Sequence, residues 1–172
     1  MIKRTGIVLV LIFTYWIFCL LQTNIGDRSQ EGTMDASELI AKYIAGERDF
    51  KAINLIGASL AKINLSGASL REASLSEADL SQADLVGTNF REASLSKANL
   101  SAANLSGAIL NGANLFAANL KGANLSDAEL KMTDLKMADL SGADLSGASL
   151  WGASLTGAKL QGTIMPDGTV HE

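Results

Sequence analysis

The chain has 172 residues, a formal net charge of −4 and 48% hydrophobic residues, with a single histidine and a single cysteine. One cysteine excludes an internal disulfide framework. A mildly acidic chain also lacks the basic excess of a nucleic-acid-binding protein, so we expect no nucleic-acid partner.

An apolar segment lies at the beginning of the chain. Lys3 and Arg4 precede fifteen uncharged residues, 7–21, and a polar stretch follows. This length lies between the core of a signal peptide and a spanning helix of about 20 residues. We therefore expect residues 1–22 to be an uncleaved membrane anchor or a signal peptide, followed by a polar linker at 23–34. The basic residues would keep the N-terminus in the cytoplasm and send the remainder across the membrane.

A short helix is predicted next, over residues 36–45 of a capping segment at 35–46. Asp35 and Glu38 have the spacing of a capping box, and Gly46 can end the helix. Four apolar residues at spacings of one, four and five would form one face that packs on the structure that follows. These are Leu39, Ile40, Tyr43 and Ile44.

A period of five then runs without interruption from Phe50 to Leu160. Every fifth residue is leucine or phenylalanine, and alanine lies two residues before this centre in eighteen of 23 pentads. In a helix these centres would scatter around the cylinder, because five residues advance by roughly 140°. A three-residue strand fits better: in Ala98-Asn99-Leu100 the first and third side chains point inward, and the next two residues turn the chain.

The pentads resemble those of the pentapeptide-repeat family, whose motif is A-(N/D)-L-x-x, as in residues 98–102, 123–127 and 143–147. The resemblance implies an all-β solenoid: a right-handed quadrilateral parallel β-helix over 47–163, with four pentads per coil and about six coils. Stacking would make the continuous core that a single coil lacks. Stacked asparagines could form side-chain ladders. Such asparagines are Asn99, Asn104, Asn114, Asn119 and Asn124.

The predicted C-terminal cap, 164–172, breaks the repeat. Pro166 lacks a backbone donor and Asp167-Gly168 favours a turn. The tail offers thin cover for the last coil, which leaves room for an end-to-end homodimer.

One face of the predicted coil gathers basic residues. With four pentads per coil, the residues after the centres 50, 70, 90, 110, 130 and 150 form a column, and no other face has one like it. Two readings stay open: a solvated charge ladder, or a docking surface for an acidic or mixed-charge protein, because interfaces are rich in arginine, methionine and aromatic residues. The candidate interaction face comprises Lys51, Arg71, Arg91, Lys131, Trp151, Met132 and Ile109.

Catalysis has little support in the sequence. His171 is next to last, and carboxylates that share a column, such as Asp79 and Asp139, would stand on a convex surface without a pocket. There is no C-x-x-C or H-x-x-x-H motif. We expect neither an enzyme nor a metal or cofactor site.

The leading functional hypothesis is a non-catalytic protein-interaction scaffold that is exported or tethered to a membrane, with a partner of unknown identity. The helix-to-repeat junction at residues 45–50 resembles that of cyanobacterial members, some of them in the thylakoid lumen or periplasm, which implies an accessory of a membrane complex. The alternative is an acidic, duplex-mimicking regulator of a nucleic-acid enzyme such as gyrase. The export segment and the basic column weigh against this alternative.

Overall fold

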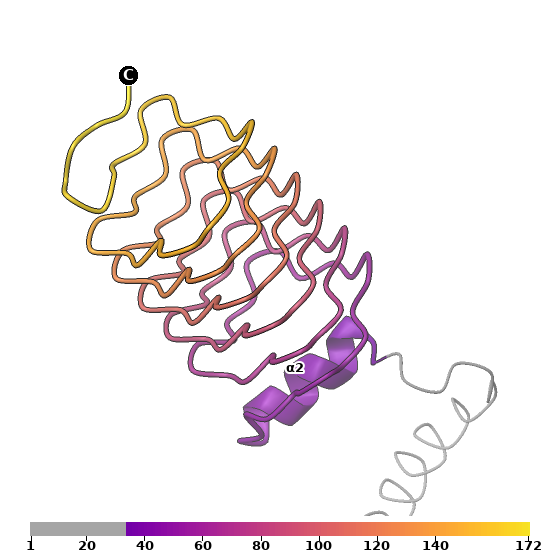
Figure 1. Ribbon diagram of the computed structural model, residues 1–172. Coiled ribbons are helices and arrows are strands. Elements are labelled where there is room, and N and C mark those ends of the chain that lie inside the picture. The colour runs from indigo at the N-terminus through magenta and orange to yellow at the C-terminus, as the bar shows by residue number, and fades with distance from the viewer. Residues whose placement is uncertain (1–33) are drawn as a thin grey trace, which may run out of the picture. The chain divides into compact units, whose positions relative to one another are not determined.

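The computed structural model of this chain describes residues 34–172, which fall within the compact unit Thr33–Glu172 (Figure 1). The predicted apolar segment and almost all of the linker therefore lie outside the described residues. Within residues 34–172, no helix is long and apolar enough to cross a membrane.

Helix α2 spans Ala36–Ile44. Its N-cap is Asp35, whose Oδ1 accepts a hydrogen bond from the Glu38 N–H at 2.8 Å, as the capping-box spacing suggests. After the C-cap at Ala45, Gly46 adopts a φ of 98°, a left-handed conformation that glycine adopts at low cost. Figure 1 shows α2 against one end of the stacked coils.

The packed face of α2 is narrower than the sequence predicts. Leu39 is fully buried, and the Tyr43 hydroxyl donates to the Ser66 carbonyl oxygen in the first coil at 2.9 Å. The prediction that Ile40 and Ile44 also face the coil is wrong, because they are 40% and 78% exposed. Ile40 follows the buried Leu39, and Ile44 follows Tyr43, so each isoleucine points about 100° away from the side chain that packs on the coil. Contact with a flat coil end needs only a narrow stripe.

The repeats form coils of twenty residues. Parallel bridges pair each residue that precedes a centre with the residue twenty positions later, from Asp49↔Ser69 to Asp144↔Ile164. The Leu100 N–H, for example, donates to the Asn119 carbonyl oxygen at 2.7 Å. Each coil therefore contains four pentads, one on each side.

The prediction of three-residue strands is wrong in detail. Among residues 34–172, each side of a coil contributes a single bridged residue, and no longer strand forms. The chain turns immediately after every centre, so the ladder is interrupted before a second consecutive bridge can form. The stack is nevertheless hydrogen-bonded in the direction of the rod at every side.

The turns have a backbone conformation that the sequence analysis did not anticipate. All 23 residues that lie two positions after a centre have positive φ, and 12 of them are not glycine. Ala102 is an example: its φ is 55°, and its N–H donates to the Lys121 carbonyl oxygen at 2.9 Å. A left-handed L-residue costs about 1–2 kcal/mol. The hydrogen bond to the next coil offsets part of this cost at each corner.

The core of the coil consists of the centres and the alanines. Every centre from Leu65 to Leu145 is completely buried. Threonine replaces alanine at three positions, and each buried hydroxyl donates to a carbonyl oxygen 23 residues earlier. These bonds are Thr88 to Leu65 (2.9 Å), Thr133 to Leu110 (2.9 Å) and Thr163 to Leu140 (2.7 Å). In the described part of the chain no buried side-chain polar atom lacks a partner.

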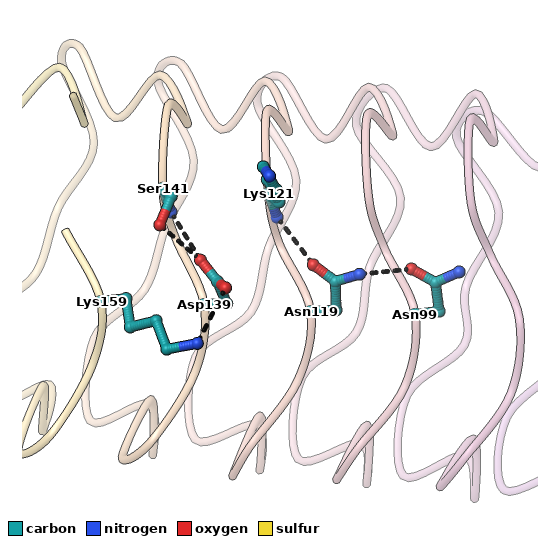
Figure 2. Close-up of polar contacts among 6 residues, drawn as sticks. All are labelled: Asn99, Asn119, Lys121, Asp139, Ser141 and Lys159. Atoms are coloured by element: carbon teal, nitrogen blue, oxygen red, sulfur yellow. Dashed lines mark hydrogen bonds and ion pairs between the residues drawn. The ribbon is translucent and has the colours of Figure 1, made fainter. Parts of the chain in front are cut away.

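Asparagine ladders stabilise two outer walls, as predicted. Asn119 donates from Nδ2 to Oδ1 of Asn99 at 3.0 Å (Figure 2). Asn99 donates in turn from its own Nδ2 to the Asp79 carboxylate, also at 3.0 Å. On the next wall Asn124 donates to Asn104 at 3.3 Å. Since a carboxylate cannot donate, Asp139 interrupts the first ladder and accepts from Lys159 Nζ at 3.4 Å instead.

The C-terminal residues form a small hairpin. Ile164 and Val170 form an antiparallel bridge, and the Met165 N–H donates to the Thr169 carbonyl oxygen at 2.7 Å. The turn lies at Asp167-Gly168, as the sequence predicts, and Gly168 has a φ of 84°. Figure 1 shows this end opposite α2.

Candidate interaction surface

The structure places the predicted basic residues in one column, which we call the basic column: Lys51, Arg71, Arg91, Asn111, Lys131 and Trp151. Backbone hydrogen bonds at the corner connect successive coils directly. The Glu92 N–H donates to the Asn111 carbonyl oxygen at 3.1 Å, and the Gly112 N–H donates to that of Lys131 at 2.9 Å. Neighbouring members of the basic column therefore belong to adjacent coils, separated by about 4.8 Å.

The two halves of the basic column differ in charge pairing. Near α2, the Glu72 carboxylate lies 3.0 Å from Lys51 Nζ and 3.9 Å from Arg71. Further along, neither Arg91 nor Lys131 has a carboxylate within 4.0 Å among residues 34–172. The unpaired positive charge is therefore concentrated at Arg91 and Lys131.

The Asn111 side chain is held in place between these two cations. Its Nδ2 donates to the Glu129 carboxylate at 2.6 Å, and its Oδ1 accepts from the Lys131 N–H at 3.0 Å. The Glu129 carboxylate is thus hydrogen-bonded to an amide. Both polar ends of Asn111 are used within the protein.

Exposed apolar side chains lie beside the unpaired cations. Trp151 is 74% exposed and Met132 is 60% exposed, although neither is required for the core. Ile109, by contrast, is only partly exposed. It is the bridged residue of a flat wall, between Asn89 and Glu129, whereas Met132 and Trp151 lie at corners.

A shallow hollow of about 320 Å³ interrupts the basic column, and we call it the notch. It arises because Asn111-Gly112 occupies the corner between the bulkier pairs Arg91-Glu92 and Lys131-Met132. A Cβ on Gly112 would have Glu92 Cγ as its neighbour at 3.5 Å, so the space above Gly112 is largely open. The notch is lined by Arg91, Glu92, Asn111, Gly112, Lys131 and Met132.

Gly152, two coils after Gly112, shows why glycine alone does not create a notch. A Cβ on Gly152 would lie 2.5 Å from Met132 Sδ, so the methionine side chain already covers this glycine. The notch was not predicted from the sequence. The pattern that indicates it is a glycine with long side chains both twenty residues before and twenty residues after it, as at Gly112.

Two carboxylates of the other walls, Asp139 and Asp144, are poorly suited to acid catalysis. The Ser141 hydroxyl, followed by its N–H, holds the pKa of Asp139 below the usual value, and Ser146 acts in the same way on the pKa of Asp144. A general acid near neutral pH needs a raised pKa. Within residues 34–172, no group of three histidine, cysteine or acidic residues is placed to hold a metal ion.

Comparison with known proteins agrees with the repeat geometry. A family model described as "Pentapeptide repeats" matches eight copies, over residues 49–85, 73–112, 108–147 and 133–167. The pentapeptide repeat protein Rfr23 from the cyanobacterium Cyanothece is 32% identical, with 80% of this chain and 100% of that chain covered and a TM-score of 0.54. Among curated proteins, none matches this chain.

Two further solved structures are similar in sequence. A pentapeptide repeat protein from the cyanobacterium Nostoc is 32% identical over 74% of this chain and 79% of its own, with a TM-score of 0.34. One from the thylakoid lumen of Arabidopsis thaliana is 31% identical over 56% and 70%, with a TM-score of 0.35. The chain belongs to the pentapeptide-repeat family, whose members fold as right-handed quadrilateral β-helices.

Proposed function

We propose that this protein is a non-catalytic scaffold that binds a protein partner through the basic column. The observation that carries the proposal is that Arg91 and Lys131, which have no ion-pair partner among residues 34–172, lie on one surface with exposed Met132 and Trp151. Arginine, methionine and tryptophan are enriched at protein interfaces. An exposed tryptophan contributes nothing to the core of the coil, so a role in binding explains its position better than a role in folding.

Export or membrane tethering forms the second part of the proposal. It rests on Lys3, Arg4 and the uncharged residues 7–21. The repeat domain would then serve a membrane complex from the periplasm or the thylakoid lumen. Protease treatment of oriented membranes tests the side on which residues 34–172 lie, and carbonate washing tests the tether. Recovery of the full-length chain in the cytosolic fraction would contradict export and favour the gyrase-regulator alternative.

Changing Arg71, Arg91 and Lys131 together to serine tests the basic column. The melting temperature should change little, because these exposed charges are screened by solvent. Partner recovery from membranes should fall sharply, and binding by the parent protein should already weaken with added salt. Mass spectrometry of the copurified proteins identifies the partner.

The matched control changes Ser81, Ser101 and Ser141 to lysine on the opposite wall. It keeps the coil and adds charge elsewhere, so partner recovery should persist. Retention of the partner by the triple-serine variant together with its loss from the lysine control would assign binding to the serine and asparagine wall instead.

An end-to-end homodimer remains part of the proposal. Leu150, Leu155 and Leu160 in the last coil are partly exposed, unlike the centres before them, and a second copy could cover them. Sedimentation velocity of the full chain in detergent would detect the dimer. A single monomeric species at micromolar concentration would contradict it.

A further inference from the structure

We infer that the notch recognises an acidic side chain of an extended protein segment, with an apolar residue of the same segment resting on Met132 and Trp151. The inference deepens the proposed function and rests on it: the basic column is the docking surface, and the notch selects the partner. The expected partner segment contains an aspartate or glutamate followed by an apolar residue. The acid lies at the notch, and the apolar residue lies nearer the C-terminal end of the rod.

The dimensions of the notch fit one side chain. Arg91 and Lys131 belong to coils that flank the coil of Asn111, so their backbones lie two coil spacings apart, or about 10 Å. A carboxylate that enters between them can reach both cations. The floor is preformed, since the Asn111 side chain is tied to Glu129 and to the Lys131 N–H, and preorganisation lowers the cost of binding.

Charge complementarity favours a carboxylate. Arg91 and Lys131 have no ion-pair partner in the described part of the chain, whereas Glu92 in the lining and Glu129, bound by the Asn111 amide, each contribute a negative charge. The attraction for a carboxylate therefore comes from the position of the two cations and not from an excess of positive charge. A guanidinium binds a carboxylate through two parallel hydrogen bonds, and a lysine ammonium adds a point charge. A nucleic-acid backbone needs a longer run of free cations. In the basic column the series of free cations stops at Arg91, because the Glu72 carboxylate is paired with Lys51 and lies near Arg71.

The apolar part of the site lies on one side of the notch only. Met132 lines the notch and reaches over Gly152, next to the exposed indole of Trp151 in the following coil. On the other side of the notch lie two charged residues, Arg71 of the basic column and its neighbour Glu72. This asymmetry gives the partner segment a direction: acid at the notch, then an apolar side chain toward Trp151.

Gly112→Met tests the notch while it leaves every cation in place. A methionine there should fill the hollow, as Met132 covers Gly152. The backbone conformation is accessible, since Glu92 and Met132 occupy the equivalent position with φ of 59°. Gly122→Met is the matched control, because Gly122 has a similar φ of 64° and nothing within 4 Å, and it follows a centre on a different wall.

The probe is a displayed library of random dodecapeptides, selected against the immobilised full-length protein. Enriched peptides should carry an acidic residue just before an apolar one. Synthetic copies are then titrated against a Trp16→Phe variant, in which Trp151 is the remaining tryptophan and reports binding by its fluorescence. Replacement of the peptide acid by its amide should weaken binding about tenfold or more, as expected for a lost charged hydrogen bond.

The variants separate this inference from the proposed function. Gly112→Met should weaken peptide binding as much as the acid-to-amide replacement does, and Gly122→Met should leave the affinity for the peptide unchanged. If the Gly112→Met variant retains affinity for the peptide but the triple-serine variant loses it, the basic column binds the peptide and the notch does not select it. Enrichment of peptides without acids, or no enrichment, overturns the inference. Equal binding by all variants overturns the proposed function as well.

Discussion

The middle coils and the last coil have the same repeat but a different environment. In the coil before the last, as in the middle coils, Leu130, Leu135 and Leu140 are completely buried, and the N–H of Leu135, for example, donates to the Ser154 carbonyl oxygen at 2.9 Å. One coil later, Leu150, Leu155 and Leu160 are partly exposed. In the described part of the chain their N–H groups donate no backbone hydrogen bond. The contribution of a leucine to stability is therefore set by the coils around it.

The two ends also differ from each other. At the first coil, α2 supplies the buried Leu39 and the Tyr43 hydroxyl, which satisfies the outward carbonyl of Ser66. At the last coil, the hairpin pairs only the corner near Gly162, whose N–H donates to the His171 carbonyl oxygen at 2.7 Å. A helix thus covers one end more completely than the hairpin covers the other. We expect unfolding to begin at the C-terminal end.

The largest expected effect comes from a charge placed inside a middle coil. Leu100→Asp would bury an unpaired carboxylate among leucine and alanine side chains and should reduce the free energy of unfolding by about 3–5 kcal/mol, with loss of several coils. Circular dichroism and thermal melts measure the loss. Ser101→Asp is the control: it changes a corner residue and should cost under about 0.5 kcal/mol. Equal losses from both changes would be incompatible with an inward leucine and an outward serine.

A smaller effect should separate the last two coils. Leu135→Ala removes a fully buried side chain and should reduce the free energy of unfolding by about 2–5 kcal/mol. Leu155→Ala, at the same wall one coil later, should cost about half as much, because water already reaches this leucine. Chemical denaturation of both variants gives the comparison. Identical costs in full-length protein would indicate that another molecule covers the last coil.

The smallest expected effect is a pH dependence on the outer walls. Hydrogen bonds from Ser141 and Ser146 lower the pKa values of Asp139 and Asp144 in the folded state. Their stabilisation is therefore present above the unfolded pKa of about 3.9 and is lost as the pH falls through the lower folded pKa. Because both carboxylates are partly exposed to solvent, the melting temperature should fall by at most about 2 °C on their account.

The double variant Asp139→Asn with Asp144→Asn should remove this part of the acid sensitivity. At position 139 the new amide can also donate to Asn119 and extend the ladder that Asp139 interrupts. Melting curves at pH 7 and pH 3 measure the difference. A variant that loses as much stability in acid as the parent would show that these two carboxylates do not contribute.

Much of the fold could be predicted from local pattern. The period of five located every inward centre, and the residue types at Asp35 and Gly46 located the ends of α2 closely. The asparagine ladders followed from stacking at a spacing of twenty. Strand length could not be predicted in the same way. It depends on where the chain turns, and the left-handed corners, 12 of them without glycine, end each side after one bridged residue.

The candidate surface was predicted as a column but not as a shape. The order of its residues follows from arithmetic on the sequence once a coil is four pentads long. The pairing of Glu72 with Lys51, the partial burial of Ile109 and the notch beside Gly112 do not. Each depends on side chains from coils twenty residues apart, whose conformations are chosen only when the coils are stacked.

By itself, the sequence determined the pentad, the inward residues and the column to which each side chain belongs. These follow from the period of five, because side-chain direction in an extended segment alternates with sequence position. The tertiary structure decided which leucines are buried, which charges remain unpaired and where the surface is hollow. The reason is physical: a coil has no core of its own, so burial, pairing and shape are properties of neighbouring coils in contact.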